Sequence, residues 1–115
     1  MTDAHFFQAL SDETRLRITM LLAAEAELSV CELVFSLSLS QPKVSRHLAY
    51  LRDAGVVSMR RQAQWVHYRL REGMEPWKKR IIFTALRGLK SSGVFANDLR
   101  RLQSMEGRPD HISAA

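Results

Sequence analysis

The residues best suited to chemistry in this sequence are one cysteine, Cys31, and four histidines, His5, His47, His67 and His111. The histidines are scattered along the chain, and none has the paired spacing that would bring two of them to one metal ion. No glycine-rich phosphate loop, pair of acids or Ser/His/Asp order accompanies the thiol. The pattern therefore favours a protein that acts by binding and not an enzyme.

Cys31 lies in the stretch ELSVCELV, at the second position of a predicted helix. Ser29 and Glu32 have the spacing of a capping box, in which the side chain of each residue bonds the backbone of the other at a helix start. A thiol at the positive end of a helix is more reactive where solvent reaches it, whereas a buried thiol packs as a small hydrophobic group. The sequence leaves open whether Cys31 reacts, binds a ligand or is buried.

The composition fits one soluble domain: 115 residues, of which 46% are hydrophobic and 25% are charged. No apolar run approaches the roughly 20 residues that span a bilayer, and the N-terminal residues MTDAHFF lack the basic region of a secretory signal. A single cysteine forms no internal disulfide, so an oxidising compartment is not favoured. We therefore expect a cytoplasmic protein without a membrane partner.

Positive charge is concentrated in the middle of the chain, although the net charge is only +5. Residues 1–40 carry two basic and six acidic side chains, whereas residues 41–80 carry ten basic and three acidic ones, a net +7. Such a segment favours a polyanionic partner such as double-stranded DNA, contacted through its phosphates. A solvated basic face would give the same count, so the elements that carry these charges decide between the two interpretations.

Four helices are predicted for the first half of the chain. Residues 3–10 form a short amphipathic helix, and Ser11 or Asp12 caps a second helix that is apolar on most sides. The capping box starts a third helix over about residues 30–37, and a longer fourth helix covers about residues 41–54. The third and fourth helices follow one another closely, as in a helix-turn-helix.

The predicted helix 41–54 has one apolar and one polar, cationic face. Ser40 is expected to cap it, Pro42 stands in the first turn where its missing N–H is harmless, and Gly55 follows its C-terminal end. The apolar stripe has the spacing i, i+4, i+7 and consists of Val44, Leu48 and Leu51. The opposite face carries Gln41, Ser45, Arg46, Ala49 and Arg52. The first turns of such a helix can offer polar side chains to the major groove of DNA.

A strand pattern follows this helix. The runs VVSMRR and WVHYRL predict a hairpin over about residues 56–70. Its tip, near residues 61–64, is polar and basic but lacks an Asn-Gly type signal, so the turn type stays open.

The last part of the chain is predicted to be helical again. A helix with a wide apolar face covers residues 75–89, and the residues SSG at 91–93 end it. A final amphipathic helix has apolar residues at i, i+4 and i+7, namely Phe95, Leu99 and Leu102. Residues 107–115 are predicted to be a flexible tail.

This order of elements predicts a winged helix-turn-helix, mainly α with a small β-hairpin, as a single domain over residues 1–106. The helix 41–54 is then the recognition helix, and the hairpin 56–70 is the wing. The expected DNA contacts are Ser40, Gln41, Lys43, Ser45, Arg46 and His47 on the helix, and Arg60, Arg61 and Gln64 on the wing. The alternative role of His47, at the edge of the apolar stripe, is to pack or to cap a hydrogen-bond network, and simple solvation is the alternative for Lys43.

From Leu10 to about Ile82 the chain resembles the ArsR/SmtB family of bacterial metalloregulatory repressors, above all its arsenic-responsive branch. The stretches that carry the resemblance are LSDETRLRI, ELSVCEL, SQPKVSRHLAYLRDAGVV and WVHYRL. The resemblance implies a homodimeric repressor in which residues 3–10 and 75–89 supply the dimerisation helices. We expect exposed apolar side chains of these helices to be buried in the dimer, namely Phe6, Phe7, Trp77 and Ile81.

The resemblance also raises the question of an effector. Arsenic-responsive relatives have cysteines at the positions of Ser29, Cys31 and Val34, because trivalent arsenic is held by three soft thiolates. This sequence keeps one of the three, so the site is incomplete, and Cys31 is the one candidate ligand. The family's zinc pattern on the helix after the wing is missing, because residues 75–92 contain no histidine. Arsenite or antimonite remains a candidate effector, beside an inert Cys31 and an effector that needs no cysteine.

The leading hypothesis is a sequence-specific repressor that binds operator DNA as a homodimer. The alternative is a winged-helix module for protein–protein contact, since this fold serves several functions. Such a module does not need the cationic segment over residues 41–80. An enzyme with Cys31 as the nucleophile is disfavoured, because no partner for the thiol is in view.

Overall fold

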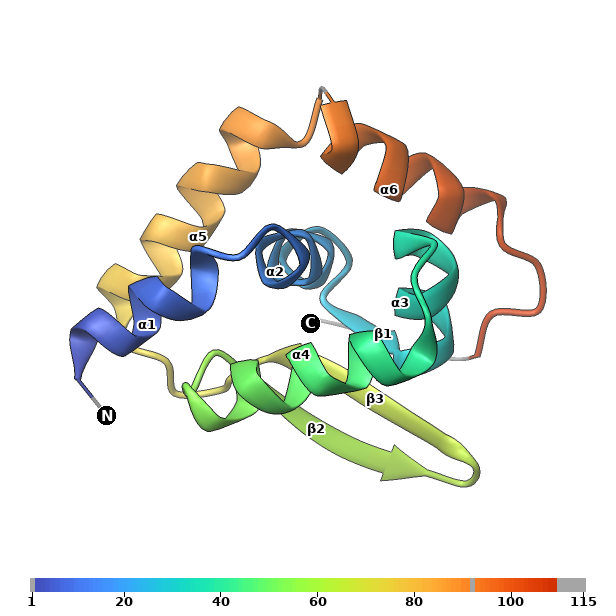
Figure 1. Ribbon diagram of the computed structural model, residues 1–115, viewed down its shortest axis with the longest axis horizontal. Coiled ribbons are helices and arrows are strands. Elements are labelled where there is room, and N and C mark those ends of the chain that lie inside the picture. Colours follow the sequence, from blue (N-terminus) through green and yellow to red (C-terminus); the bar gives the residue numbers. More distant parts are fainter. Residues whose placement is uncertain (1, 92, 110–115) are drawn as a thin grey trace.

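The computed structural model describes residues 2–91 and 93–109. In these residues six helices pack together with one small sheet (Figure 1). The elements, in chain order, are α1 Asp3–Leu10, α2 Glu13–Glu25, β1 Glu27–Ser29, α3 Val30–Leu37, α4 Gln41–Asp53, β2 Val57–Gln62, β3 Trp65–Leu70, α5 Pro76–Leu89 and α6 Gly93–Ser104. No helix in the described part of the chain is long and apolar enough to cross a membrane.

The predicted helix starts are confirmed. Asp12 caps α2 by accepting a hydrogen bond from the backbone N–H of Arg15 at 3.0 Å. The capping box of α3 is present in both directions between Ser29 and Glu32. Ser40 caps α4 through the N–H of residue 43. These side chains satisfy backbone groups that have no partner inside their own helix.

The end of α4 connects it tightly to the wing. The N–H of Gly55 donates to the carbonyl of Arg52 at 3.0 Å, and the N–H of Val56 donates to the carbonyl of Leu51 at 2.9 Å. These two bonds form a Schellman motif, which needs a residue with positive φ at its centre. Gly55 supplies it with a φ of +76°. Strand β2 therefore begins directly after the recognition helix.

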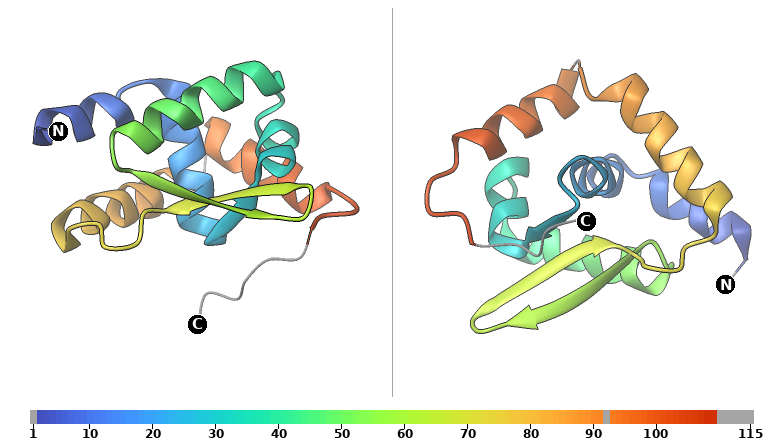
Figure 2. Two further views of the ribbon diagram at one scale, coloured as in Figure 1. Left: turned by 90° about the horizontal axis from the view of Figure 1, so that it is seen from below. Right: turned by 180° about the vertical axis from the view of Figure 1, so that it is seen from behind.

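The sheet contains a strand that the sequence analysis did not predict. Its strand order is β1-β3-β2, with both pairs antiparallel. Strands β2 and β3 form the predicted hairpin, which projects from the helices (Figure 2). Its two-residue turn places Ala63 at a φ of 52°. Strand β1 is three residues long, too short for an alternating pattern to show, and it forms by pairing with β3 across a long sequence separation.

Helix α2 lies at the centre of the core, with the other helices and the sheet around it (Figures 1 and 2). Its buried residues Ile18, Leu21 and Leu22 are almost fully shielded from solvent. They join one hydrophobic cluster with Leu48 of α4 and Leu102 of α6. The apolar stripe of α4 packs against α2 and the sheet, so the polar face of α4 points to solvent.

The C-terminal part of the chain differs in one respect from the prediction. Helix α5 ends at Leu89 and α6 begins at Gly93, close to the predicted break at residues 91–93; Ser92 lies outside the described residues. Arg108, which the sequence analysis assigned to a flexible tail, instead forms ion pairs with Glu32 at 2.5 Å and Glu25 at 3.3 Å. The rest of that tail, residues 110–115, lies outside the described residues.

Candidate nucleic-acid interface

The exposed face of α4 carries most of the predicted contact residues. Gln41, Ser45 and Arg46 are exposed, and Lys43 is half-buried at the edge of the face. Ser40 is also exposed, although its hydroxyl accepts the capping bond. The helix therefore presents two groups able to contact base edges, an amide and a guanidinium, on its first two turns.

The wing brings a second set of polar side chains to the same region. Arg61 and Gln64 are exposed at the far end of the hairpin. Gln64 and Gln41 line one groove of about 510 Å³, so the wing tip and the start of α4 lie on either side of the same hollow. A duplex that receives α4 in its major groove would meet Arg61 at the neighbouring backbone.

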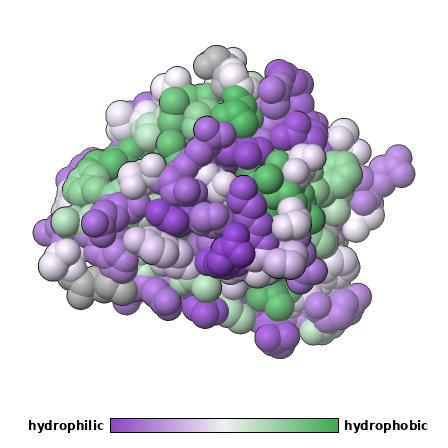
Figure 3. Space-filling view, in the orientation of Figure 1, coloured by the Kyte–Doolittle hydropathy of each residue, from purple (hydrophilic) through white to green (hydrophobic). Residues whose placement is uncertain are grey.

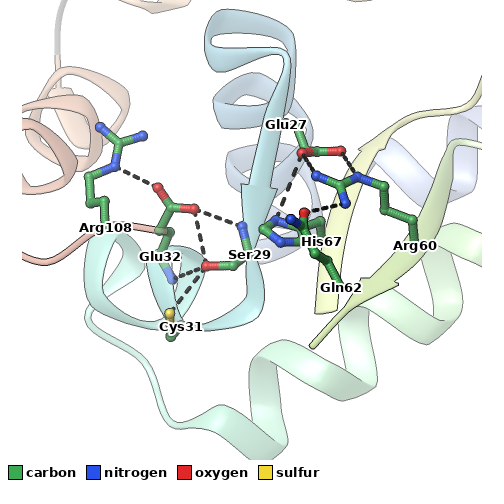
Figure 4. A network of polar contacts seen from close by, with 8 residues as sticks. All are labelled: Glu27, Ser29, Cys31, Glu32, Arg60, Gln62, His67 and Arg108. Atoms are coloured by element: carbon green, nitrogen blue, oxygen red, sulfur yellow. Dashed lines mark hydrogen bonds and ion pairs between the residues drawn. The ribbon is translucent and has the colours of Figure 1, made fainter. Parts of the chain in front are cut away.

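Arg60 is placed differently from the sequence prediction. Its guanidinium binds the carboxylate of Glu27 through two hydrogen bonds of 2.7 and 2.8 Å, and a third bond reaches Gln62 at 2.7 Å (Figure 4). The hydrogen bond with Glu27 raises the pKa of Arg60 above its usual value. Glu27 is 2% exposed, so Arg60 neutralises a buried acid of β1. The Arg60 side chain is therefore half-buried and paired within the sheet, and its contact with DNA stays a prediction.

His67 belongs to the same buried network. Its ring is 1% exposed, and its Nδ1 lies 3.8 Å from a carboxylate oxygen of Glu27. His67 is thus a buried side chain of the hairpin.

His47 points toward α2, the second of its two predicted roles. Its Nδ1 lies 3.5 Å from a guanidinium nitrogen of Arg15 and 3.8 Å from a carboxylate oxygen of Asp12. Burial lowers the pKa of His47; Asp12 opposes this effect, whereas the cations Arg15, Arg46 and Lys43 add to it. Folding therefore favours the neutral form of the imidazole at this position.

Acidification should destabilise the protein in part through His47. Because the pKa of His47 is lowered by folding, the unfolded chain binds the proton more readily than the folded one. The stabilising contribution is complete above the ordinary histidine value of about 6.5 and is lost as the pH falls through the lower value of the folded protein. Urea unfolding at pH 8 and pH 5.5, at one protein concentration, measures the free energy of unfolding. Between these pH values His47→Gln should lose less of this free energy than the parent chain. An equal loss in both would contradict this prediction.

The predicted dimer face is present in part. Phe7 is 47% exposed, and Trp77 and Ile81 are half-buried. Phe6 was expected to be exposed, and this is wrong: it is 2% exposed and packs inside the subunit, edge-on to Trp77. Phe83 of α5 is 40% exposed, but it lies on another side of the helix, in a groove with Leu22 and Ala23 of α2. Figure 3 shows hydrophobic residues at the surface along α5 and over α3.

Cys31 is half-buried beside the capping box. Its sulfur lies 3.1 Å from the Ser29 hydroxyl oxygen, which bonds Glu32, and Glu32 in turn bonds Arg108 (Figure 4). Within the described residues no group of three His, Cys, Asp or Glu side chains could hold a metal ion. Since the sequence has one cysteine, a single chain cannot supply the three thiolates that trivalent arsenic prefers. The residues present therefore do not fit such a site.

Comparison with known proteins identifies the family. The family model described as "Bacterial regulatory protein, arsR family" matches residues 12–59. The "Arsenic resistance transcriptional regulator ArsR2" of Pseudomonas putida is 46% identical over 109 residues, covering 95% of this chain and 93% of that protein. The chain belongs to the arsR family.

Other arsR-family members agree with this assignment. The "Arsenical resistance operon repressor" of Escherichia coli is 51% identical over 81 residues, 70% of this chain and 69% of that protein. The solved structure of HlyU from Vibrio cholerae superimposes with a TM-score of 0.67 at 38% identity, covering 75% of this chain and 89% of that chain. The winged helix-turn-helix fold expected from the sequence is thus confirmed for this arsR-family chain.

Proposed function

We propose that this arsR-family chain binds operator DNA as a homodimer and represses transcription, acting as a cytoplasmic regulator and not as an enzyme. The observation that carries the proposal is the polar, cationic face of α4, which continues across a groove to the wing tip. The names of the relatives, which are regulators and repressors, support it.

In the proposed complex α4 lies in the major groove. Gln41 and Arg46 contact base edges, with Ser45 beside them, because amide and guanidinium groups can form paired hydrogen bonds with adenine and guanine. Lys43 contacts a phosphate at the edge of the groove, and Arg61 contacts the backbone beside it. The network around Arg60 joins the three strands of the sheet, through Glu27 of β1, Arg60 and Gln62 of β2 and His67 of β3.

The proposed dimer joins α1 and α5 of two subunits. Phe7, Trp77 and Ile81 provide the apolar surface, which a subunit of this size would otherwise leave partly in water. A two-fold dimer requires a palindromic operator whose half-sites lie roughly 10 bp, or one helical turn, apart. The alternative function, a protein–protein module, leaves the cationic face of α4 without a partner.

Selection from random-sequence DNA duplexes tests this function without knowledge of the target genes. The protein should enrich an imperfect palindrome and bind it with an affinity that falls steeply with salt. Light scattering at micromolar concentration should report a dimer. A monomeric protein, or enrichment of no sequence, would refute the proposal and favour the protein–protein module.

Substitutions on α4 and on the wing should behave differently. Gln41→Ala and Arg46→Ala should each relax the preference for particular base pairs by about 1–3 kcal/mol, because each loses a base contact. Arg61→Ala should weaken binding to all DNA sequences by the same factor and reduce the salt dependence of binding, because it loses a phosphate contact. Competition binding with single-base operator variants measures the difference. A wing variant with altered base preference, beside helix variants without one, would reverse the assignment.

For the effector, the names of the relatives put arsenite first, with antimonite as its chemical analogue. We propose that one thiolate per chain is too few for tight metalloid binding, so that Cys31 acts as a packing residue of α3. Near-stoichiometric arsenite or antimonite should then leave the protein–operator complex intact, for both the parent and Cys31→Ser. If arsenite or antimonite released the parent chain from the operator but did not release Cys31→Ser, Cys31 would be a sensor.

A further inference from the structure

Arg15, in the first turn of α2, contacts two other helices at once. Its Nε donates to the carbonyl of Ala9 at 2.9 Å, and its Nη2 donates to the carbonyl of Gln8 at 3.2 Å. The plane of the guanidinium lies over the ring of Tyr50, 3.9 Å from its centre. Nη1 faces Nδ1 of His47 at 3.5 Å. One side chain thus joins the end of α1 to the last turns of α4.

Each of these contacts suits its chemical partner. The last carbonyls of a helix lack the N–H donors of a following turn and carry partial negative charge, so a cation there stabilises the end of α1; the Gln8 carbonyl also accepts from the N–H and hydroxyl of Ser11. Tyr50 offers its ring face to the cation, and His5 of α1 meets the same ring edge-on at 5.6 Å between centroids. The contact to His47 requires a neutral imidazole, because a guanidinium only donates.

We infer that Arg15 is a positioning residue, which sets the orientation of the recognition helix α4 relative to the dimerisation helix α1. This inference rests on the proposed function. In a two-fold dimer the α1 helices define the symmetry axis, so the angle between α1 and α4 fixes how the two recognition helices are spaced on DNA. Loss of the link would therefore lower operator affinity without removing any contact to DNA.

The link depends on the planar, forked shape of arginine. Two backbone carbonyls and an aromatic face are engaged by one rigid group, which a lysine ammonium cannot reproduce. Arg15→Lys keeps the charge and should lose the link, whereas Tyr50→Phe keeps the ring and should retain it. A residue that instead contacted a phosphate directly would tolerate lysine and would change the salt dependence by about one phosphate.

The experiment measures binding to the selected operator and to random DNA for Arg15→Lys, Arg15→Gln, Tyr50→Leu, Tyr50→Phe and the Arg15→Lys/Tyr50→Leu double variant. Arg15→Lys, Arg15→Gln and Tyr50→Leu should each lose at least about five-fold in operator affinity, with dimer mass, random-DNA affinity and salt slope unchanged at a temperature where each variant is folded. The double variant should lose no more than the worse single variant, because both remove one link. Arg100→Gln, an exposed arginine of α6, controls for the lost charge.

Three outcomes would overturn the inference. Full operator affinity in Arg15→Lys with a reduced salt slope in Arg15→Gln would make Arg15 a phosphate contact. Additive losses in the double variant would make Arg15 and Tyr50 independent. Normal operator affinity in all variants would leave the repressor function standing and remove the link, whereas a parent chain that selects no operator would refute the proposed function itself.

Discussion

The double substitution Ser29→Cys/Val34→Cys should make the protein release its operator at near-stoichiometric arsenite. It restores the three cysteine positions that the resemblance to arsenic-responsive relatives implies. The geometry supports the change: the Ser29 oxygen already lies 3.1 Å from the Cys31 sulfur, and Val34 shares a groove with Cys31 and stands one helical turn further on. Three soft thiolates at one helix start would hold trivalent arsenic, and binding would distort α3.

Release is measured by titrating the labelled protein–operator complex with arsenite. Ser29→Cys/Asn97→Cys is the matched control, because it has the same number of thiols with one of them on the exposed face of α6. We expect the Ser29→Cys change to cost about 1 kcal/mol of stability through the weakened cap, so unfolding is measured beside binding. A response of the control equal to that of the double variant would refute the assigned positions.

Asp98→Ala should destabilise the protein by about 3–5 kcal/mol, the usual cost of removing one partner from a buried ion pair. Asp98 of α6 is 1% exposed and receives two hydrogen bonds from Arg17 of α2, at 2.9 and 2.8 Å. Its backbone carbonyl accepts a bond from Ser36 of α3 at 2.8 Å, and its side chain accepts another from Arg101 at 2.8 Å. Without the carboxylate, Arg17 becomes a buried charge that lacks its counter-ion.

Urea unfolding of Asp98→Ala against Asn97→Ala, an exposed neighbour on the same helix, measures this cost. Replacing both partners, as in Arg17→Met/Asp98→Leu, should cost less than Asp98→Ala, because no charge is then stranded. An exposed ion pair contributes up to about 1 kcal/mol. If Asp98→Ala lowered the free energy of unfolding by less than this, solvent would reach Arg17.

Local signals in the sequence predicted most of the helical framework. Ser29 with Glu32, and Ser40 with Pro42, are start signals that act within a few residues, and the structure places helix starts at both. The recognition helix followed from the spacing of its apolar stripe. The exposed candidates Gln41 and Arg46 lie where that spacing put them.

The features that the sequence did not reveal depend on partners far along the chain. Arg60 looked like a free basic residue of the wing, because Glu27, its partner, is 33 residues away. Phe6 looked exposed in a short terminal helix, and its burial depends on α5 folding back against it. Arg108 is separated from Glu32 by 76 residues. No periodicity or capping pattern encodes such pairs, since they arise only when distant elements pack.

The Schellman motif at Gly55 has a consequence for the genes that this protein can control. Three residues join α4 to β2, and two hydrogen bonds fix the turn that they make, so we expect α4 and the wing to move as one body. In the proposed complex the stretch of DNA covered by one subunit then has a fixed length, from the base edges at α4 to the backbone at the wing. Natural targets of the repressor should therefore keep each half of the palindrome constant, and any insertion or deletion tolerated between targets should fall at its centre, where only the dimer contact has to adapt.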